Sequence, residues 1–93
     1  MAQATARHIL VETEKQCNEL KQQIEQGADF AEVAATHSSC PSGRNGGDLG
    51  SFSPGQMVPE FDTVVFNDEV GVVHGPVKTQ FGFHLLEIQS RSD

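Results

Sequence analysis

The segment that most constrains the fold of this chain runs from residue 37 to residue 66, HSSCPSGRNGGDLGSFSPGQMVPEFDTVVF. It holds five glycines and three prolines within about a third of the chain. Glycine weakens helices and strands, and proline interrupts the hydrogen bonding of both. The part from residue 38 to residue 50 is therefore predicted to be a loop with room for one helical turn.

Hydrophobic periodicity divides the rest of the chain into short strands and helices. Thr13 with Gln16 predicts a capping box at the start of the first helix, and Gly27 suits its end. Asp29 is the expected cap of the second helix, and Pro59 the first-turn residue of the last one. The predicted strands are 6–11, 48–52, 75–79 and 82–89, and the predicted helices are 13–27, 29–38 and 59–66. This order indicates an α+β fold with helices packed on a small sheet.

Length and charge limit the classes of function. The 93 residues can bury one modest core, so residues 1–93 are predicted to form a single domain. Six Lys and Arg against thirteen Asp and Glu give a net charge of −7, which argues against binding to nucleic acid or to an anionic membrane. No apolar run approaches the roughly 18 residues of a membrane helix, and no signal peptide is visible, so we expect a cytoplasmic protein. The acidic surface makes a monomer the expected state.

Two histidines occupy the first and the last predicted strand. Because alternate residues of a strand share a face, His8 lies with Leu10, and His84 lies with Leu86. If these two strands pair, both histidines lie on one face and touch. Taken singly, each is best explained as a core or half-exposed side chain; together, with Cys40 nearby, they indicate a site.

The two cysteines differ in their surroundings. Cys17 falls at an apolar position of the first helix and is assigned to the core, whereas Cys40 lies in the loop rich in Gly and Ser. The absence of a disulfide framework fits a reducing compartment. Cys40 lacks the CxxC or HxxxH spacing of a zinc site, so no metal or other cofactor is predicted. A cysteine hydrolase is an alternative on residue types alone, although Cys40 has no such signature around it.

Four apolar side chains lie in or beside the loop or in a turn: Leu49, Met57, Phe61 and Phe81. The simpler interpretation is that they close the core from above. The more specific one is that they line an apolar pocket beside the two histidines.

Nearly the whole sequence resembles a known family. The motifs HIL, GADFAEVAATHS, GGDLGSFSPGQMVPEFDTVVF and GPVKTQFGFHLLEI are similar, in order and spacing, to those of the parvulins, which are peptidyl-prolyl cis/trans isomerases. The resemblance runs from about Ala6 to Arg91 and is strongest with the small single-domain bacterial parvulins. It implies the FKBP-like superfold, with a four-stranded antiparallel sheet surrounded by four helices in the order β-α-α-α-β-α-β-β. It implies no cofactor.

The resemblance also implies roles for individual residues. His8 and His84 match the paired histidines of the family, and Thr79 matches the threonine that joins their hydrogen-bond network. Cys40 matches the active-site cysteine, which is aspartate in some relatives. These four are the expected catalytic residues. The expected substrate-binding residues are Leu49, Gln56, Met57, Val58, Phe61 and Phe81.

One departure from the family bears on specificity. Phosphate-directed parvulins carry a basic cluster in a longer loop after the first strand, whereas here residues 11–16 read VETEKQ, with two acids and Lys15. Arg44 alone does not replace that cluster. We therefore expect an isomerase that acts on X-Pro bonds with neutral or apolar X and has no phosphate requirement. We expect it to assist protein folding. Its expected partners are prolyl peptides and unfolded or partly folded proteins. The alternatives are a prolyl-peptide binding module without catalysis and the cysteine hydrolase.

Overall fold

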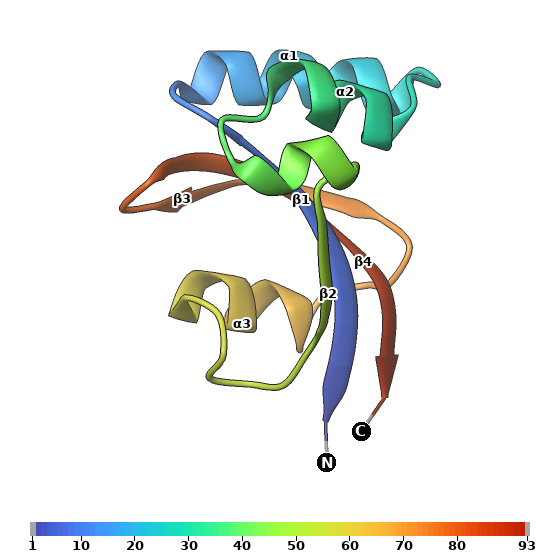
Figure 1. Ribbon diagram of the computed structural model, residues 1–93, viewed down its shortest axis with the longest axis vertical. Coiled ribbons are helices and arrows are strands. Elements are labelled where there is room, and N and C mark those ends of the chain that lie inside the picture. Colours follow the sequence, from blue (N-terminus) through green and yellow to red (C-terminus); the bar gives the residue numbers. More distant parts are fainter. Residues whose placement is uncertain (1, 93) are drawn as a thin grey trace.

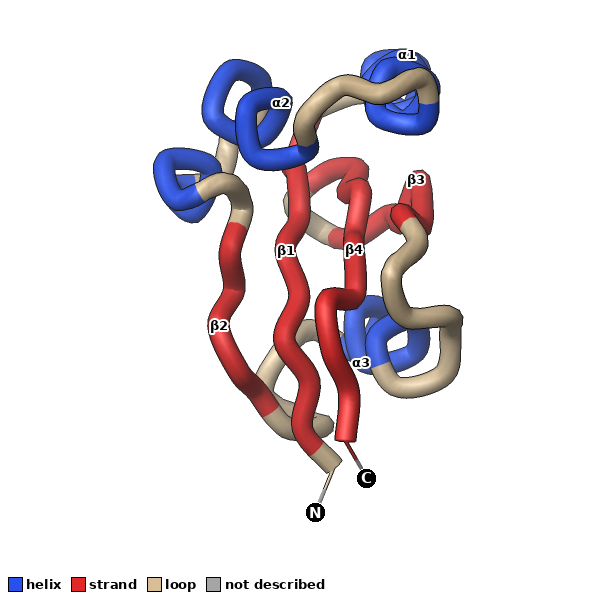
Figure 2. Tube along the Cα trace, turned by 90° about the vertical axis from the view of Figure 1, so that its right-hand side faces the viewer, coloured by secondary structure: helices blue, strands red, loops and turns tan. Residues whose placement is uncertain are grey.

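The fold is built on a four-stranded antiparallel sheet. The computed structural model describes residues 2–92, in which the strands are β1 (Gln3–Val11), β2 (Asp48–Phe52), β3 (Val73–Thr79) and β4 (Gly82–Ser92). Their order in the sheet is β2-β1-β4-β3, and each neighbouring pair is antiparallel (Figure 2). The first and last strands of the sequence therefore pair at the centre, and the predicted α+β architecture is confirmed.

Three α-helices and one short 3-10 helix accompany the sheet: α1 (Glu14–Glu25), α2 (Phe30–His37), η1 (Pro41–Asn45) and α3 (Pro59–Val65). The expected four-helix arrangement is corrected here, because residues 41–45 form a 3-10 turn where a third of four α-helices was expected. Pro41 begins this turn, and Gly46 ends it in the left-handed region at φ 71°. None of the helices in the described part of the chain is both long and apolar enough to cross a membrane.

Side chains cap the N-termini of α1 and α2 at the predicted positions. The Oγ1 atom of Thr13 accepts a hydrogen bond from the backbone N–H of Gln16 at 3.1 Å. The Oδ2 atom of Asp29 accepts one from the backbone N–H of Glu32 at 3.2 Å. Each bond satisfies one of the free N–H groups at a helix N-terminus, and such a cap contributes about 1 kcal/mol.

The sheet carries one apolar core on each face, and strand alternation decides which residues join which core. Ile9 and Val11 of β1 pack under α1 and α2, while Ala4 and Ala6 of the same strand pack against α3. Figure 1 shows α1 and α2 together at the top of the view and α3 at the lower left. His8 is an even-numbered residue of β1 and therefore belongs to the face that α3 covers.

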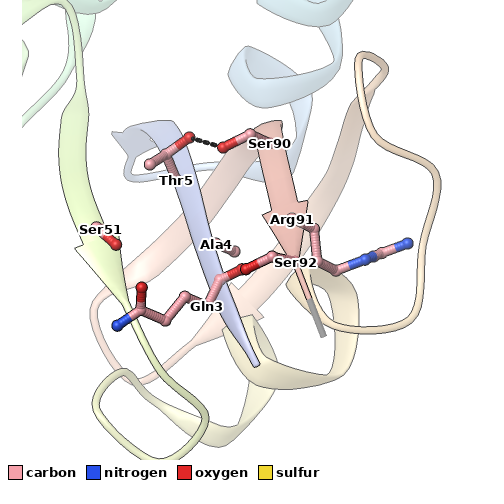
Figure 3. Close-up of a pocket in the computed structure, with 7 residues that line it drawn as sticks. All are labelled: Gln3, Ala4, Thr5, Ser51, Ser90, Arg91 and Ser92. Carbon is pink, nitrogen blue, oxygen red and sulfur yellow. Dashed lines mark hydrogen bonds between the residues drawn. The ribbon is translucent and has the colours of Figure 1, made fainter. Parts of the chain in front are cut away.

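The strands extend beyond the apolar runs that predicted them. β1 begins at Gln3, β3 at Val73, and β4 continues to Ser92, because cross-strand pairing orders polar residues that no apolar pattern marks. Near the chain ends the hydroxyl oxygens of Thr5 and Ser90 lie 2.6 Å apart across β1 and β4, at the edge of a hollow of about 200 Å³ (Figure 3). This hollow is lined by Ala4 and by mostly polar side chains that include Arg91, and neither histidine is part of its lining.

Candidate active site

The two histidines meet at the centre of the sheet. His8 comes from β1 and His84 from the neighbouring strand β4, and their Nδ1 atoms lie 3.1 Å apart. The rings are nearly parallel, with an interplanar angle of 16°. Only 5% of His8 and 3% of His84 is exposed. The contact expected from strand alternation is therefore present, and it is buried.

On the His84 side the network ends at the backbone. The Oγ1 atom of Thr79, at the end of β3, lies 2.7 Å from the Nε2 atom of His84. The same oxygen accepts a hydrogen bond from the backbone N–H of Phe81 at 3.1 Å. The tight turn between β3 and β4 thus fixes the ring of His84.

On the His8 side the network reaches the loop through a serine that the sequence did not predict. The Nε2 atom of His8 lies 3.0 Å from the Oγ atom of Ser42. The Ser42 hydroxyl in turn donates to the Sγ atom of Cys40 at 3.3 Å. In the described structure, Ser42 therefore forms the hydrogen-bonded link between Cys40 and the histidines.

Burial keeps both rings neutral. It lowers the pKa of His8 from 6.5 to about 4, and the neighbouring His84 adds to this effect. Burial also lowers the pKa of His84 to about 4. At neutral pH each ring therefore offers one N–H donor and one nitrogen acceptor.

Donor and acceptor counting gives the network a direction. Because Ser42 donates to Cys40, its oxygen accepts from Nε2–H of His8. The Nδ1 atom of His8 is then an acceptor for Nδ1–H of His84, whose Nε2 atom accepts from the hydroxyl of Thr79. Every group is satisfied once in this arrangement, so the network favours one tautomer of each histidine.

Backbone contacts hold the Cys40 loop against β1. The Oγ atom of Ser38 accepts from the backbone N–H groups of Leu10 at 3.0 Å and of Cys40 at 3.3 Å. At the other end of the loop, the backbone N–H of His8 donates to the carbonyl of Gly47 at 2.9 Å. A Cβ atom at Gly47 would lie 2.2 Å from the carbonyl oxygen of His8, so this approach requires glycine.

An apolar pocket of about 360 Å³ opens beside the network. Five of the six expected substrate-binding residues line it, together with three of the four expected catalytic ones. They are Leu49, Met57, Val58, Phe61 and Phe81, with His8, Cys40 and His84. The fourth expected catalytic residue, Thr79, is buried behind His84 and is not part of the lining.

Phe61 joins the pocket to the histidines. It is 4% exposed and belongs to the core beneath α3. Its ring makes edge contacts with His84, at 4.8 Å between centroids, and with His8, at 5.5 Å. Phe81, which also lines the pocket, is 62% exposed. The pocket thus has one wall packed into the core and one wall exposed to solvent.

The structure departs from the predicted site in a few positions. Gln56 lies outside the pocket lining; its Oε1 atom accepts from the backbone N–H of Ser53 at 2.7 Å and so fixes the preceding turn. Leu10, Ser39 and Pro41 line the pocket although the sequence did not mark them. Strand alternation, which places Leu10 on the face of His8, was the available signal for Leu10.

The two cysteines occupy the environments that the sequence predicted. Cys17 is fully buried in the core under α1, and burial raises the pKa of its thiol to about 11. Cys40 is partly exposed at the pocket wall. A thiol such as that of Cys17 is protonated and inert, so Cys40 is the cysteine available for chemistry.

Comparison with known proteins agrees with this geometry. The model of the rotamase family, the PPIC-type PPIase domain, matches residues 3–90. The foldase protein PrsA of Geobacillus sp. (strain WCH70) is 44% identical over 89 residues, which make up 95% of this chain and 32% of that protein. The chaperone SurA of Burkholderia lata is 36% identical over 102 residues, with 23% of its length covered. The chain thus spans about a third or less of these curated relatives.

Solved structures show the same fold. The crystal structure of the peptidylprolyl isomerase PrsA from Bacillus anthracis superposes with a TM-score of 0.94 at 35% identity, covering 99% of this chain and 43% of that one. The solution structure of the parvulin of Nitrosopumilus maritimus gives 0.86 at 28% identity, covering 97% of this chain and 98% of that one. The chain therefore belongs to the parvulin family, as a PPIC-type peptidyl-prolyl cis/trans isomerase domain.

Proposed function

We propose that this chain isomerises X-Pro bonds in unfolded or partly folded proteins, with neutral or apolar X and without a phosphate requirement. One observation carries the proposal: an apolar pocket large enough for a proline ring lies directly against a buried, neutral hydrogen-bond network. Its relatives named foldase and chaperone support protein chains as the clients.

The pocket supplies the environment that favours rotation. The peptide bond resists twisting by about 18–20 kcal/mol because resonance gives it partial double-bond character. The twisted transition state loses the charge-separated resonance form and is less polar than the planar ground state. A pocket walled by Leu49, Met57 and Phe61 therefore binds the twisted form in preference, while it fixes the proline ring.

The network positions a polar group at the rotating carbonyl. The sulfur of Cys40 accepts from the hydroxyl of Ser42 and lines the pocket, so it acts on the substrate as an electrostatic or hydrogen-bonding group, a role that an aspartate carboxylate can also fill. His8 and His84 hold this arrangement as neutral partners. The proposed mechanism has no covalent intermediate, since isomerisation requires no bond to break.

The expected specificity follows from charge. None of the described residues that line the apolar pocket carries a formal charge at neutral pH when the histidines are neutral. The segment after β1 holds Glu12 and Glu14 next to Lys15, and the chain carries a net charge of −7. A phosphate or carboxylate directly before proline would lose hydration here without gaining a basic cluster.

NMR exchange spectroscopy on short X-Pro peptides, with catalytic amounts of protein, tests the proposal. X is varied among Leu, Ala, Glu and phosphoserine. Uncatalysed exchange takes tens to hundreds of seconds, so acceleration is easily resolved. We expect fast exchange for Leu and Ala and slow exchange for Glu and phosphoserine. Acceleration greatest for phosphoserine would refute the specificity, and peptide binding without acceleration of any peptide would identify a binding module. Cleaved peptide would identify a hydrolase.

A further inference from the structure

A groove with a polar lining adjoins the apolar pocket. Its volume is about 560 Å³, and it lies between the C-terminal end of α2 and the turn η1. Ala35 and Ser38 line it on the α2 side, and Gly43 and Arg44 on the η1 side. None of the expected catalytic or substrate-binding residues other than Cys40 lines this groove.

A shared rim connects the groove to the apolar pocket. Residues 39–41 line both hollows, so Cys40 stands between them. The rim is held in place, because the backbone N–H of Ser39 donates to the carbonyl of Leu10 at 2.8 Å, and Ser38 binds the backbone of both Leu10 and Cys40. A peptide chain extends from a proline on both sides, so the shared rim offers a route from the pocket into the groove.

The groove offers a cation where the pocket offers none. Arg44 is exposed, and among residues 2–92 the one ion pair joins Arg7 to Glu87, so Arg44 has no carboxylate partner there. In a chain with a net charge of −7, an uncompensated guanidinium beside the expected catalytic cysteine attracts an acidic group.

We propose that this groove is a subsite for the client chain, in which Arg44 binds a carboxylate side chain two or three residues away from the proline. The proposal rests on the proposed isomerase function. Four residues of a 3-10 turn, at about 2.0 Å each, separate Cys40 from Arg44 by roughly 8 Å. An extended peptide advances about 3.3 Å per residue, so about two to three residues cover this span. In this proposed binding mode the position directly before proline stays at the rim, so the expected exclusion of acids there is unaffected.

Eight Leu-Pro peptides test this subsite. They carry either Glu or Gln at the second or third position, before or after the proline, and exchange is measured by NMR at low and high salt. On one side of the proline we expect the Glu peptide to have a kcat/KM about twofold to fivefold higher than its Gln counterpart, mainly through KM. High salt should remove the difference, since an exposed ion pair is screened.

Two variants complete the test. Arg44→Ala should abolish the preference for Glu, while Lys15→Ala, which removes an exposed charge on α1, should leave it intact. Equal rates for Glu and Gln at all four positions would overturn the subsite, and so would a preference that persists in Arg44→Ala. If the protein does not accelerate exchange even of the Gln peptides, the isomerase function itself is refuted. Failure of the subsite and failure of the isomerase function therefore give different results.

Discussion

The hydroxyl of Ser42 is the link on which the proposed network depends, and Ser42→Ala removes it. The change leaves Nε2–H of His8, on a ring that is only 5% exposed, without its acceptor. An unsatisfied buried donor costs about 1–3 kcal/mol. If about 1.4 kcal/mol of this penalty falls on the transition state, kcat/KM drops about tenfold. Because Ser42 does not line the apolar pocket, KM should change little.

The assay is NMR exchange on a Leu-Pro peptide, with the tautomer of His8 followed by nitrogen-15 shifts. Ser51→Ala is the matched control, since this serine is exposed on β2 and its side chain has no hydrogen bond among the described residues. Ser42→Thr retains a hydroxyl and should recover most of the activity. Full activity in Ser42→Ala, with the proton of His8 still on Nε2, would refute the reasoning.

Three further predictions follow from the same site. His8 and His84 should stay neutral down to about pH 4, because burial lowers the pKa of both rings to about 4. Only the unfolded chain then takes up protons between pH 6.5 and 4, so the free energy of unfolding should fall as the pH drops through this window. NMR titration midpoints near 6.5 would contradict this. Cys40→Asp should keep substantial activity in the exchange assay, whereas a trapped thiol adduct with substrate would disprove the non-covalent role. Gly47→Ala should lower the free energy of unfolding by about 2–3 kcal/mol in urea titrations. The loss should exceed that of Gly50→Ala, because a Cβ atom at Gly50 would lie in open space. Equal losses would argue against the close approach of Gly47 to the backbone of His8.

Local sequence signals predicted the local features of the fold well. Thr13 and Asp29 mark helix starts because each cap bonds a residue three positions later. The helix type of the turn at residues 41–45 was harder to predict, because Pro and Gly permit a 3-10 turn as readily as an α-helical one. The polar ends of β1 and β4 become strand only through pairing with each other, and no local pattern records such distant contacts.

Some residues of the candidate site could likewise be predicted from the sequence, and others could not. Strand alternation was enough to bring His8 and His84 together, because both lie on regular central strands. Ser42 lies in the 3-10 turn η1 and Gln56 in the irregular segment before α3, and in both places side-chain direction depends on backbone turns that residue types do not specify. The resemblance to parvulins supplied the roles of Cys40 and of the pocket residues. The cytoplasmic location and the monomeric state stay predictions.

The proposed function depends on the apolar pocket, which accelerates rotation about the X-Pro bond. The most direct test compares exchange of one Leu-Pro peptide in the native chain and in the double variant Leu49→Ala/Met57→Ala, which trims two partly buried pocket walls. The variant Val70→Ala/Val72→Ala trims two apolar side chains at exposed positions outside the pocket and serves as the control. We expect strong acceleration by the native chain and by the control, and a loss of about tenfold or more in the pocket variant. Undiminished exchange in a folded pocket variant would contradict it.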